Sequence, residues 1–169
     1  MEHGHVVHGQ QLYGESVHVP LILVPPGRKD GRVVGQVVRS ADLMPTILYA
    51  VGIRPPDSLD GESLLPCLKG RCQERYALAC WGNAISVRDA RFTYLRRGRP
   101  DEYSEELFDR QTDPREQKDI SRLEPGITAS MRAVAFDKFN RNAGQGHLCW
   151  NGDISNKTGY SNALMRFME

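Results

Sequence analysis

A short apolar run, Leu21-Ile22-Leu23-Val24, most constrains what this chain can fold into. It contains no charge, and Pro25-Pro26-Gly27 ends it. A continuous apolar run of this length is typical of a strand covered on both faces, as in the parallel sheets of α/β proteins. The polar segment before it carries three histidines in its first eight residues. A His-bearing loop that leads into a buried strand is how α/β enzymes present catalytic groups at a sheet edge.

The remainder of the first 70 residues predicts one further strand and one helix. Arg32–Val38 is rich in valine and is predicted as a strand. Ser40 is expected to cap a helix with one apolar face, and Gly52 is expected to end it. Ile53–Gly61 is predicted as a loop because it is rich in Pro, Asp and Gly. The leucines of Leu64–Leu68 suggest a short helical turn.

The pattern changes after Arg71 to short strands with turns between them, which favours an antiparallel meander. The expected strands are Tyr76–Trp81, Ala84–Val87, Phe92–Arg96 and Glu106–Phe108. From Pro125 to about Asn142 the apolar residues follow a helical period. The tail from His147 to Glu169 has no clear period and is expected to be loosely ordered.

These patterns predict an α/β fold in which a fragment of a large mixed sheet precedes a small antiparallel sheet with one long helix. We expect three parts, residues 1–70, 71–146 and 147–169. A strand at Leu21–Val24 needs parallel neighbours on both sides, and the chain offers at most one or two. Residues 1–70 are therefore predicted to expose apolar surface.

Composition narrows the choice of partners. The formal net charge of +1 gives no electrostatic reason to expect a nucleic acid or an anionic membrane as partner. No apolar run approaches the ~20 residues that span a membrane. The N-terminus lacks a basic segment followed by an apolar one, so no signal peptide is predicted, and the compartment is left open.

The four cysteines form no C-x-x-C pair, which argues against a zinc ribbon. They are Cys67, Cys72, Cys80 and Cys149. Free, partly buried thiols are one interpretation. A Cys67–Cys72 or a Cys72–Cys80 disulfide is the other, in an oxidising compartment.

Four motifs in the first 120 residues resemble the sulfatase family, which belongs to the alkaline-phosphatase-like superfamily. The family's first motif is E-H-G, with a His or Lys five residues after its histidine, followed by L-Y-E-E-x-x-R-V-P-L-I. The later motifs are D-L-x-P-T-I-L, D-G-x-S-L, and E-L-Y-D-L followed by D-P-x-E. In this chain the matching segments are Glu2–Ile22, Ser40–Leu48, Leu59–Leu64 and Glu106–Glu116. One motif alone is a weak signal, but four in the right order at fitting spacing are a specific one.

Two departures bear on what the resemblance implies. The family's nucleophile is matured to formylglycine within C/S-x-P-S/A-R, and no cysteine here has the Pro and Arg of that motif. The family's calcium ligands would also lie outside this chain, so no metal ligand is assigned. The chain thus resembles the C-terminal part of a sulfatase, beginning just after the metal-binding loop. Gly14 and His18 replace the family's usual acidic residue and arginine.

The resemblance implies a sulfuric ester hydrolase that acts on a sulfate ester such as a sulfated sugar, with calcium as the cofactor of the full-length family. The present chain, as a fragment, is expected to show no turnover alone. Two alternatives stay open. One is a truncated or pseudo-sulfatase that acts as a binding module. The other is a phosphodiester or phosphonate hydrolase of the same superfamily.

His8 is the one residue to which the resemblance gives a catalytic and substrate-binding role, because the matching His or Lys of the family contacts the substrate's sulfate. A cationic donor stabilises the charge on the peripheral oxygens of a transferring sulfuryl group. A histidine also titrates near neutral pH and could protonate the leaving oxygen. A solvated loop histidine is the competing interpretation.

The neighbouring residues receive structural interpretations. His3, His5 and His8 form H-x-H-x-x-H, which we interpret as a chance cluster and not a zinc site. His3 is expected to shape the loop. Tyr13 and Glu15 are expected to close the loop onto the following strand by hydrogen bonds. The basic run Arg96-Arg97-Gly98-Arg99 is interpreted as a solvated hairpin turn, with contact to an anionic polysaccharide as the alternative.

Overall fold

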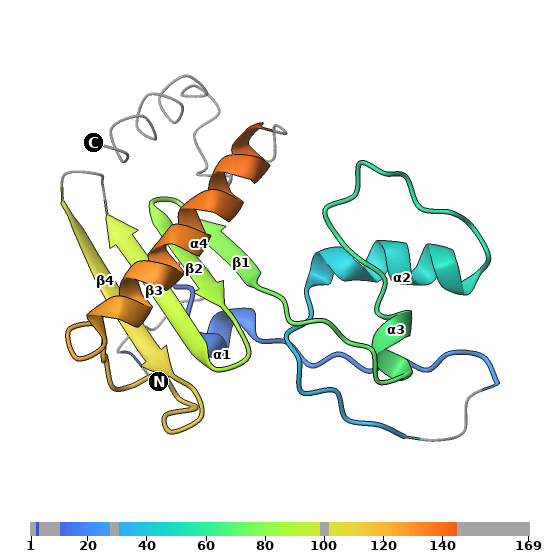
Figure 1. Cartoon of the computed structure of the whole chain (residues 1–169), viewed down its shortest axis with the longest axis horizontal. Helices are drawn as coiled ribbons and strands as arrows, with labels where there is room; N and C mark the ends of the chain where they lie inside the picture. Colours follow the sequence, from blue (N-terminus) through green and yellow to red (C-terminus); the bar gives the residue numbers. More distant parts are fainter. Residues whose placement is uncertain (1–2, 4–10, 28–30, 99–101, 145–169) are drawn as a thin grey trace. The chain divides into compact units, whose positions relative to one another are not determined.

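The computed structural model describes residues 3, 11–27, 31–98 and 102–144, with side chains described as far as Asp137 (Figure 1). The chain divides into two compact units. The sheet unit comprises residues 1–19 and 78–169, and the helical unit comprises residues 20–77. The domain boundary predicted near residue 70 stays a prediction, since compactness alone does not define a domain. The predicted tail, residues 147–169, lies outside the described residues.

The sheet unit contains a four-stranded sheet in the order β1-β2-β3-β4. The strands are β1 (Ala77–Trp81), β2 (Ala84–Arg88), β3 (Phe92–Gly98) and β4 (Tyr103–Asp109). The pairs β2–β3 and β3–β4 are antiparallel, with Tyr94 opposite both Val87 and Leu107. The predicted meander is confirmed. The strands β3 and β4 run two and three residues further into their hairpin than the sequence pattern indicated.

One face of the sheet is covered by the long helix α4 (Pro125–Gly144), as Figure 1 shows. Val87, Tyr94 and Leu107 point to this face and pack against Met131 and Ala135 of the helix. They lie directly opposite one another on three adjacent strands, so their side chains share one face of the sheet. The helix and its apolar stripe, predicted from the spacing of Ile127, Met131 and Val134, are both confirmed.

The opposite face is covered by the N-terminal segment. Leu95 and Phe108, one position along from the residues that face α4, pack with Leu12 and Tyr13. The short helix α1 (Gly14–Val17) follows directly, and its last residue packs against the same cluster. The sheet is therefore apolar on both faces, and residues more than 80 positions apart in the chain form its second core.

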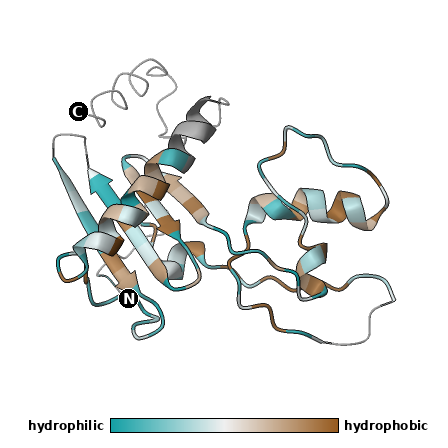
Figure 2. Ribbon diagram, in the orientation of Figure 1, coloured by the Kyte–Doolittle hydropathy of each residue, from teal (hydrophilic) through white to brown (hydrophobic). Residues whose placement is uncertain are grey.

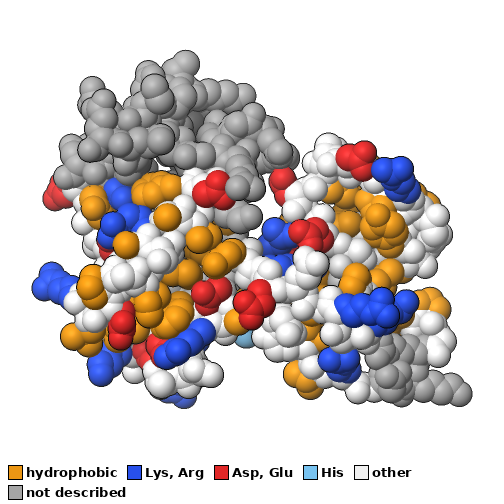
Figure 3. Space-filling model, in the orientation of Figure 1, with side chains coloured by type: hydrophobic (Ala, Val, Ile, Leu, Met, Phe, Trp, Pro, Cys, Tyr) orange, Lys and Arg blue, Asp and Glu red, His pale blue; other side chains and the backbone are white. Residues whose placement is uncertain are grey.

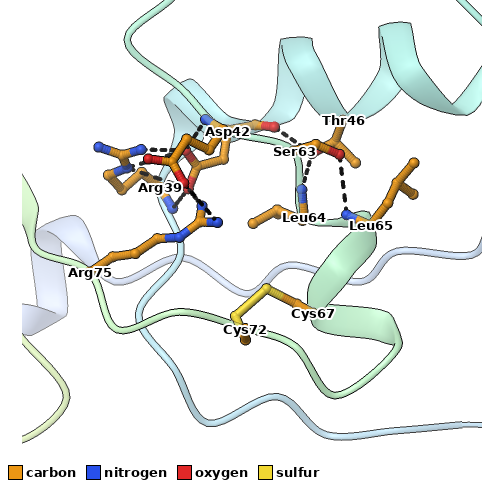
Figure 4. The surroundings of a disulfide bond; sticks show 10 residues. Arg39, Asp42, Thr46, Ser63, Leu64, Leu65, Cys67, Cys72 and Arg75 are labelled. Atoms are coloured by element: carbon orange, nitrogen blue, oxygen red, sulfur yellow. Dashed lines mark hydrogen bonds and ion pairs between the residues drawn. A yellow bond between two sulfur atoms is a disulfide. The ribbon is translucent and has the colours of Figure 1, made fainter.

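The helical unit is organised around the buried carboxylate of Asp42 (Figure 4). A 3-10 turn, η1 (Ser40–Asp42), leads into helix α2 (Leu43–Ala50), and helix α3 (Leu65–Leu68) follows after a loop. The carboxylate accepts hydrogen bonds from the Arg39 backbone N–H (3.0 Å), the Arg39 guanidinium (2.7 Å), the Glu62 N–H (2.9 Å) and Arg75 (3.1 Å). Burial alone raises the pKa of this carboxyl, but the hydrogen bonds from Arg39 and Glu62 outweigh it, and the pKa lies below its ordinary value.

The family's second and third motifs meet at this carboxylate. The hydroxyl of Thr46, in D-L-x-P-T-I-L, accepts a hydrogen bond from the Leu64 N–H of the D-G-x-S-L loop (2.8 Å). A Cβ on Gly61 would lie 1.9 Å from the carbonyl oxygen of Ala41, so the loop can approach η1 only with glycine at this position. The motif residues thus hold the unit together.

A disulfide joins Cys67 to Cys72 beside α3 (Figure 4). Of the two pairings that the sequence left open, the first is therefore confirmed, and Cys72–Cys80 is excluded. The predicted helix and the short turn at Leu64–Leu68 are also confirmed. The cap predicted at Ser40 is wrong, because Ser40 is the first residue of η1, Arg39 is the N-cap of that turn, and α2 begins at Leu43 after Asp42. Gly52 follows α2 with a φ of 79°, as expected for a residue that ends a helix.

Both strands predicted in this unit are wrong. Leu21–Val24 and Arg32–Val38 form no strand, and Ile22 and Val33 are 86% and 95% exposed. No other extended segment in the described part of the chain pairs with them, so their backbone groups do not form the ladder of hydrogen bonds that defines a strand. The prediction that the first 70 residues expose apolar surface is confirmed. Figure 2 shows where hydrophobic residues lie along the backbone of this unit. Among the described residues, no helix is long and apolar enough to cross a membrane.

Candidate functional site

His8 and His5 lie outside the described residues, so the structure gives no position for either. The segment that carries them, residues 4–10, is bounded by described residues on both sides. His3 precedes it, and Gln11, Leu12 and Tyr13 follow it. The candidate site is therefore described through these two anchors and the groups that hold them.

His3 anchors the first end of the segment. Its ring stacks on that of Tyr13, with centroids 3.7 Å apart and planes 8° from parallel. Its Nε2 lies 2.6 Å from the carbonyl oxygen of Glu116, so this nitrogen carries the donated proton. Its Nδ1 lies 3.5 Å from a carboxylate oxygen of Glu15, which is an ion-pair distance and not a hydrogen bond. These contacts support the loop-shaping role expected for His3.

Tyr13 anchors the second end. Its hydroxyl donates to the Glu106 carboxylate on β4 (2.9 Å) and accepts from the guanidinium of Arg97 on β3. Arg97 and Glu106 also form an ion pair with each other. Burial, the largest cause, raises the pKa of the Tyr13 phenol, so it remains a donor at neutral pH. The predicted hydrogen bonding by Tyr13 is confirmed, but its partners are on the antiparallel sheet and not on the segment that follows it.

Glu116 connects the two anchors. It is 2% exposed, and its carboxylate accepts from the Gly14 N–H (2.6 Å), the Arg88 guanidinium (2.5 Å) and the Thr93 hydroxyl (2.7 Å). Its carbonyl accepts from His3 as described above. The last acidic residue of the closing D-P-R-E motif thus fixes the E-H-G motif about 100 positions earlier in the chain. The two motifs occur together because they form one hydrogen-bonded cluster.

Gly14 stands where the resemblance places an acidic residue, and the cluster gives a physical reason for glycine. A Cβ at this position would lie 2.9 Å from Nη2 of Arg88 and 3.4 Å from Oε2 of Glu116. The Arg88 guanidinium is buried and bonded, so it has little freedom to move away. The carboxylate of Glu116 already bonds to Arg88 at this place.

The basic run at residues 96–99 is not a solvated turn, and that interpretation is wrong for the residues that can be judged. Strand β3 continues through them, with Arg97 opposite Ser104. The guanidinium of Arg96 is buried over the ring of Tyr103, 3.5 Å from its centroid. Arg97 is bonded to Tyr13 and Glu106, and Arg99 lies outside the described residues. The guanidinium groups of Arg96 and Arg97 are thus engaged within the protein and do not support contact with a polyanion.

The described residues do not fit a calcium site. They contain no group of three or more His, Cys, Asp or Glu side chains that could hold a metal ion. The best-buried carboxylates, Asp42 and Glu116, are taken up by arginines and backbone N–H groups. We derive no step through a metal from them.

An open cavity of about 320 Å³ lies beside α1 in the sheet unit. It is lined by Gln11, Leu12, Glu15, Ser16, Val17, Ala79, Cys80 and Trp81. The Oε1 atom of Gln11 is buried and has no hydrogen-bond partner among the described residues. An indole, an amide, a carboxylate and a hydroxyl therefore border one hollow, and part of its lining comes from the residues that follow the His8 segment in the sequence.

Sequence reasoning identified the motifs but missed the residues that join them. Arg88 and Thr93 carry no motif, and only a structure reveals their contact with Glu116. Glu116 itself was visible as the last residue of D-P-R-E. A buried carboxylate that needs an arginine was the available signal, but the sequence does not say which of its arginines supplies it.

Comparison with known proteins agrees with the fold. The family model described as N-sulphoglucosamine sulphohydrolase, C-terminal, matches residues 2–132. Arylsulfatase K of Mus musculus is 32% identical over an alignment of 135 positions, which covers 71% of this chain and 24% of that protein. Delta 4,5-hexuronate-2-O-sulfatase of Bacteroides thetaiotaomicron is 29% identical over an alignment of 147 positions, which covers 77% of this chain and 30% of that protein. A solved structure of a 2-O GAG sulfatase is 29% identical with a TM-score of 0.51, over 60% of this chain and 24% of that one.

The chain spans less than a third of the length of each of these relatives. The matched residues include all four motifs, both anchors of the His8 segment and the four strands of the sheet. The chain has the α/β fold of the C-terminal part of its relatives, and it belongs to the sulfatase family.

Proposed function

We propose that this chain forms the C-terminal part of a sulfuric ester hydrolase and supplies His8 to the site that binds the sulfuryl oxygens. The observation that carries the proposal is the anchoring of the His8 segment. The rings of His3 and Tyr13 stack on each other, Tyr13 bonds to Glu106 of the sheet, and Glu116 accepts hydrogen bonds from the His3 ring and from the Gly14 N–H. A segment fixed at both ends loses less entropy when a side chain on it binds substrate.

The chemistry assigned to His8 follows from the reaction. Transfer of a sulfuryl group leaves negative charge on its peripheral oxygens and on the departing alcohol oxygen. A protonated imidazole stabilises the first charge by a hydrogen bond and can give its proton to the second. Loss of one such donor typically costs about 10²–10³ in rate.

The nucleophile and the calcium ligands of the family have no counterpart among the described residues of this chain. Calcium, when bound in a complete sulfatase, supplies charge that stabilises the sulfate. We expect the isolated chain to bind and position and not to turn over. Hydrolysis therefore needs the rest of the sulfatase domain, which the relatives contain outside the region that matches this chain.

A sulfated sugar is the substrate class that the cavity beside α1 favours. Trp81 supplies an aromatic surface for the apolar face of a sugar ring, and Gln11, Glu15 and Ser16 supply hydrogen-bonding groups. Two similar proteins, the hexuronate-2-O-sulfatase and the 2-O GAG sulfatase, act by name on sulfated sugars. The buried, unpartnered oxygen of Gln11 would gain a donor from a sugar hydroxyl after a small side-chain movement.

A chimera tests the proposal. In it, the 135 matched residues of mouse arylsulfatase K are replaced by the corresponding residues of this chain, and hydrolysis of a chromogenic aryl sulfate is followed with calcium present. We expect turnover that EDTA abolishes. His8→Ala is expected to lower kcat about 10²–10³-fold, while His5→Ala, the matched control on the same segment, stays within about twofold.

Three outcomes would contradict the proposal. A folded chimera without activity, beside an active parent enzyme, would refute the hydrolase function. A fully active His8→Ala chimera would refute the role of His8 alone. Faster hydrolysis of a phosphodiester than of the sulfate ester would assign the site to the other ester class.

A further inference from the structure

The cysteines of the described residues are all engaged in disulfides. Cys67 is bonded to Cys72, and Cys80 on strand β1 is also disulfide-bonded. Because Cys67 and Cys72 are bonded to each other, neither is the partner of Cys80. The sequence contains one further cysteine, Cys149. Cys149 is therefore the cysteine of this chain that remains available to Cys80.

Strand β1 presents the side chain of Cys80 to the face of the sheet that α4 covers. Leu78 packs against the cluster that α4 forms with the sheet, and Ala79 packs against the cluster on the opposite face. Since successive side chains of a strand alternate between the two faces, Cys80 shares the face of Leu78. Its backbone belongs to an edge strand, so the same residue also borders the hollow beside α1. A segment that continues from α4 thus starts on the same side of the sheet as the Cys80 side chain.

The sequence places Cys149 a short distance beyond α4. The helix ends at Gly144, and Cys149 follows five residues later. Five residues of extended chain reach at most about 18 Å. The first half of α4 lies beside β4, where Arg132 bonds to Glu105 (2.6 Å), and Figure 1 shows the helix crossing the sheet toward β1. The C-terminal end of the helix thus directs the chain toward the strand that carries Cys80.

Strand β1 is also the least covered strand of the sheet. It lies at one edge of the order β1-β2-β3-β4, and none of its five residues is buried, whereas each of the other three strands has buried residues. Trp81, its last residue, is 42% exposed, and Figure 3 shows further hydrophobic side chains on the surface of the sheet unit. Natural proteins cover or block open strand edges, because an unpaired edge promotes aggregation. A segment fastened beside β1 would provide such cover.

We infer that Cys80 and Cys149 form an intramolecular disulfide that fastens the tail, residues 147–169, to the edge strand β1. As the S–S bond forms, the two thiols give two electrons and two protons to a disulfide oxidant such as oxidised glutathione, which is reduced to two thiols. The bond persists in an oxidising compartment. It would be present whether or not the chain takes part in hydrolysis.

The bond should stabilise the sheet unit by restricting its unfolded state. A disulfide between Cys80 and Cys149 closes a loop of about 70 residues that contains β2, β3, β4 and α4. In the chain-entropy model, a cross-link that closes a long loop removes much of the entropy of the unfolded chain. Loss of the bond should therefore be visible as a lower Tm.

Peptide mapping of the whole chain tests the bond directly. The chain is expressed with export to an oxidising compartment, free thiols are blocked with iodoacetamide, and tryptic peptides are analysed by mass spectrometry without reductant. We expect peptide 76–88, which holds Cys80, to be joined to peptide 142–157, which holds Cys149, and to separate from it after dithiothreitol. The Cys67–Cys72 bond, seen as peptide 40–69 joined to peptide 72–75, is the internal control.

Serine variants give a second, independent measurement. Cys80→Ser and Cys149→Ser should each free one thiol in the unfolded, unreduced protein, whereas the wild type and the double variant should have none. Each single variant should lower the Tm by about 5 °C or more. The double variant should lose no more than the larger single loss, because one bond is lost in all three. Cys67→Ser/Cys72→Ser keeps the Cys80–Cys149 bond and is the matched control, expected to have no free thiol.

Four results would contradict the bond. Iodoacetamide-blocked Cys80 and Cys149 in the oxidised wild type would overturn the inference, as would a bond from either residue to Cys67 or Cys72. A dimer on a non-reducing gel that dithiothreitol converts to monomers would assign the bond to a second copy and would also overturn it. Additive Tm losses in the double variant would show that the two cysteines act separately, which a shared bond does not allow.

Discussion

Replacement of the buried Glu116 should cost several kcal/mol of stability, and the structure allows the magnitude to be worked out. Its carboxylate bonds to Arg88, Thr93 and the Gly14 N–H in a buried environment. Glu116→Gln keeps the shape but leaves the buried Arg88 without its counter-charge. Removing one partner of a buried ion pair typically costs about 3–5 kcal/mol. Typical domains have only about 5–15 kcal/mol in total.

The free energy of unfolding in urea, followed by circular dichroism, measures this loss. We expect the midpoint of the transition to fall sharply for Glu116→Gln. Glu102→Gln on the exposed hairpin is the matched control and should change stability by less than about 0.5 kcal/mol. The double variant Glu116→Gln/Arg88→Met removes both charges and should lose less than the sum of the single changes.

The result that would refute the reasoning is specific. A loss below about 1 kcal/mol for Glu116→Gln would mean that water reaches Arg88 and that the pair is not a buried one. Strict additivity in the double variant would mean that Glu116 and Arg88 do not depend on each other. Either result would also remove the physical link between the two motifs.

Three other changes have defined outcomes. Replacing Cys67 and Cys72 by serine should cost about 2 kcal/mol for so short a loop, seen as a lower Tm than that of the parent chain. Asp42 contributes stability above the unfolded pKa of about 3.9, and this is lost as the pH falls through its lowered folded pKa. Asp42→Asn should therefore be less stable at pH 7 and lose less on acidification to pH 3, by urea unfolding. Gly14→Ala should cost about 1–3 kcal/mol by crowding Arg88, and an unchanged urea midpoint would show that Arg88 yields freely.

The sheet unit could be predicted because its strand and turn patterns are local and because each strand has its pairing partner within the same unit. The strands β1 to β4 are joined by short turns, and each finds its partner in the next segment of the chain. The stripe on α4 finds its partner in the same sheet. Where the sequence pattern and the available partners agree, period and turn residues suffice.

The basic run at residues 96–99 was wrongly predicted to be solvated because its side chains are charged. Arg96 and Arg97 occupy strand positions whose neighbours are Tyr103 and Glu106 on the adjacent strand and, for Arg97, the distant ring of Tyr13. No local pattern distinguishes a guanidinium that will be buried over Tyr103 from one that will remain in water. Only the register of β3 against β4 brings them together.

In the helical unit, a sequence pattern that is typical of strands does not lead to strands. Leu21–Val24 has the composition of a buried strand, but hydrogen bonds to neighbouring strands make a strand, and the described residues provide none. The same unit builds a buried polar centre at Asp42, which helix-period patterns would have assigned to the surface.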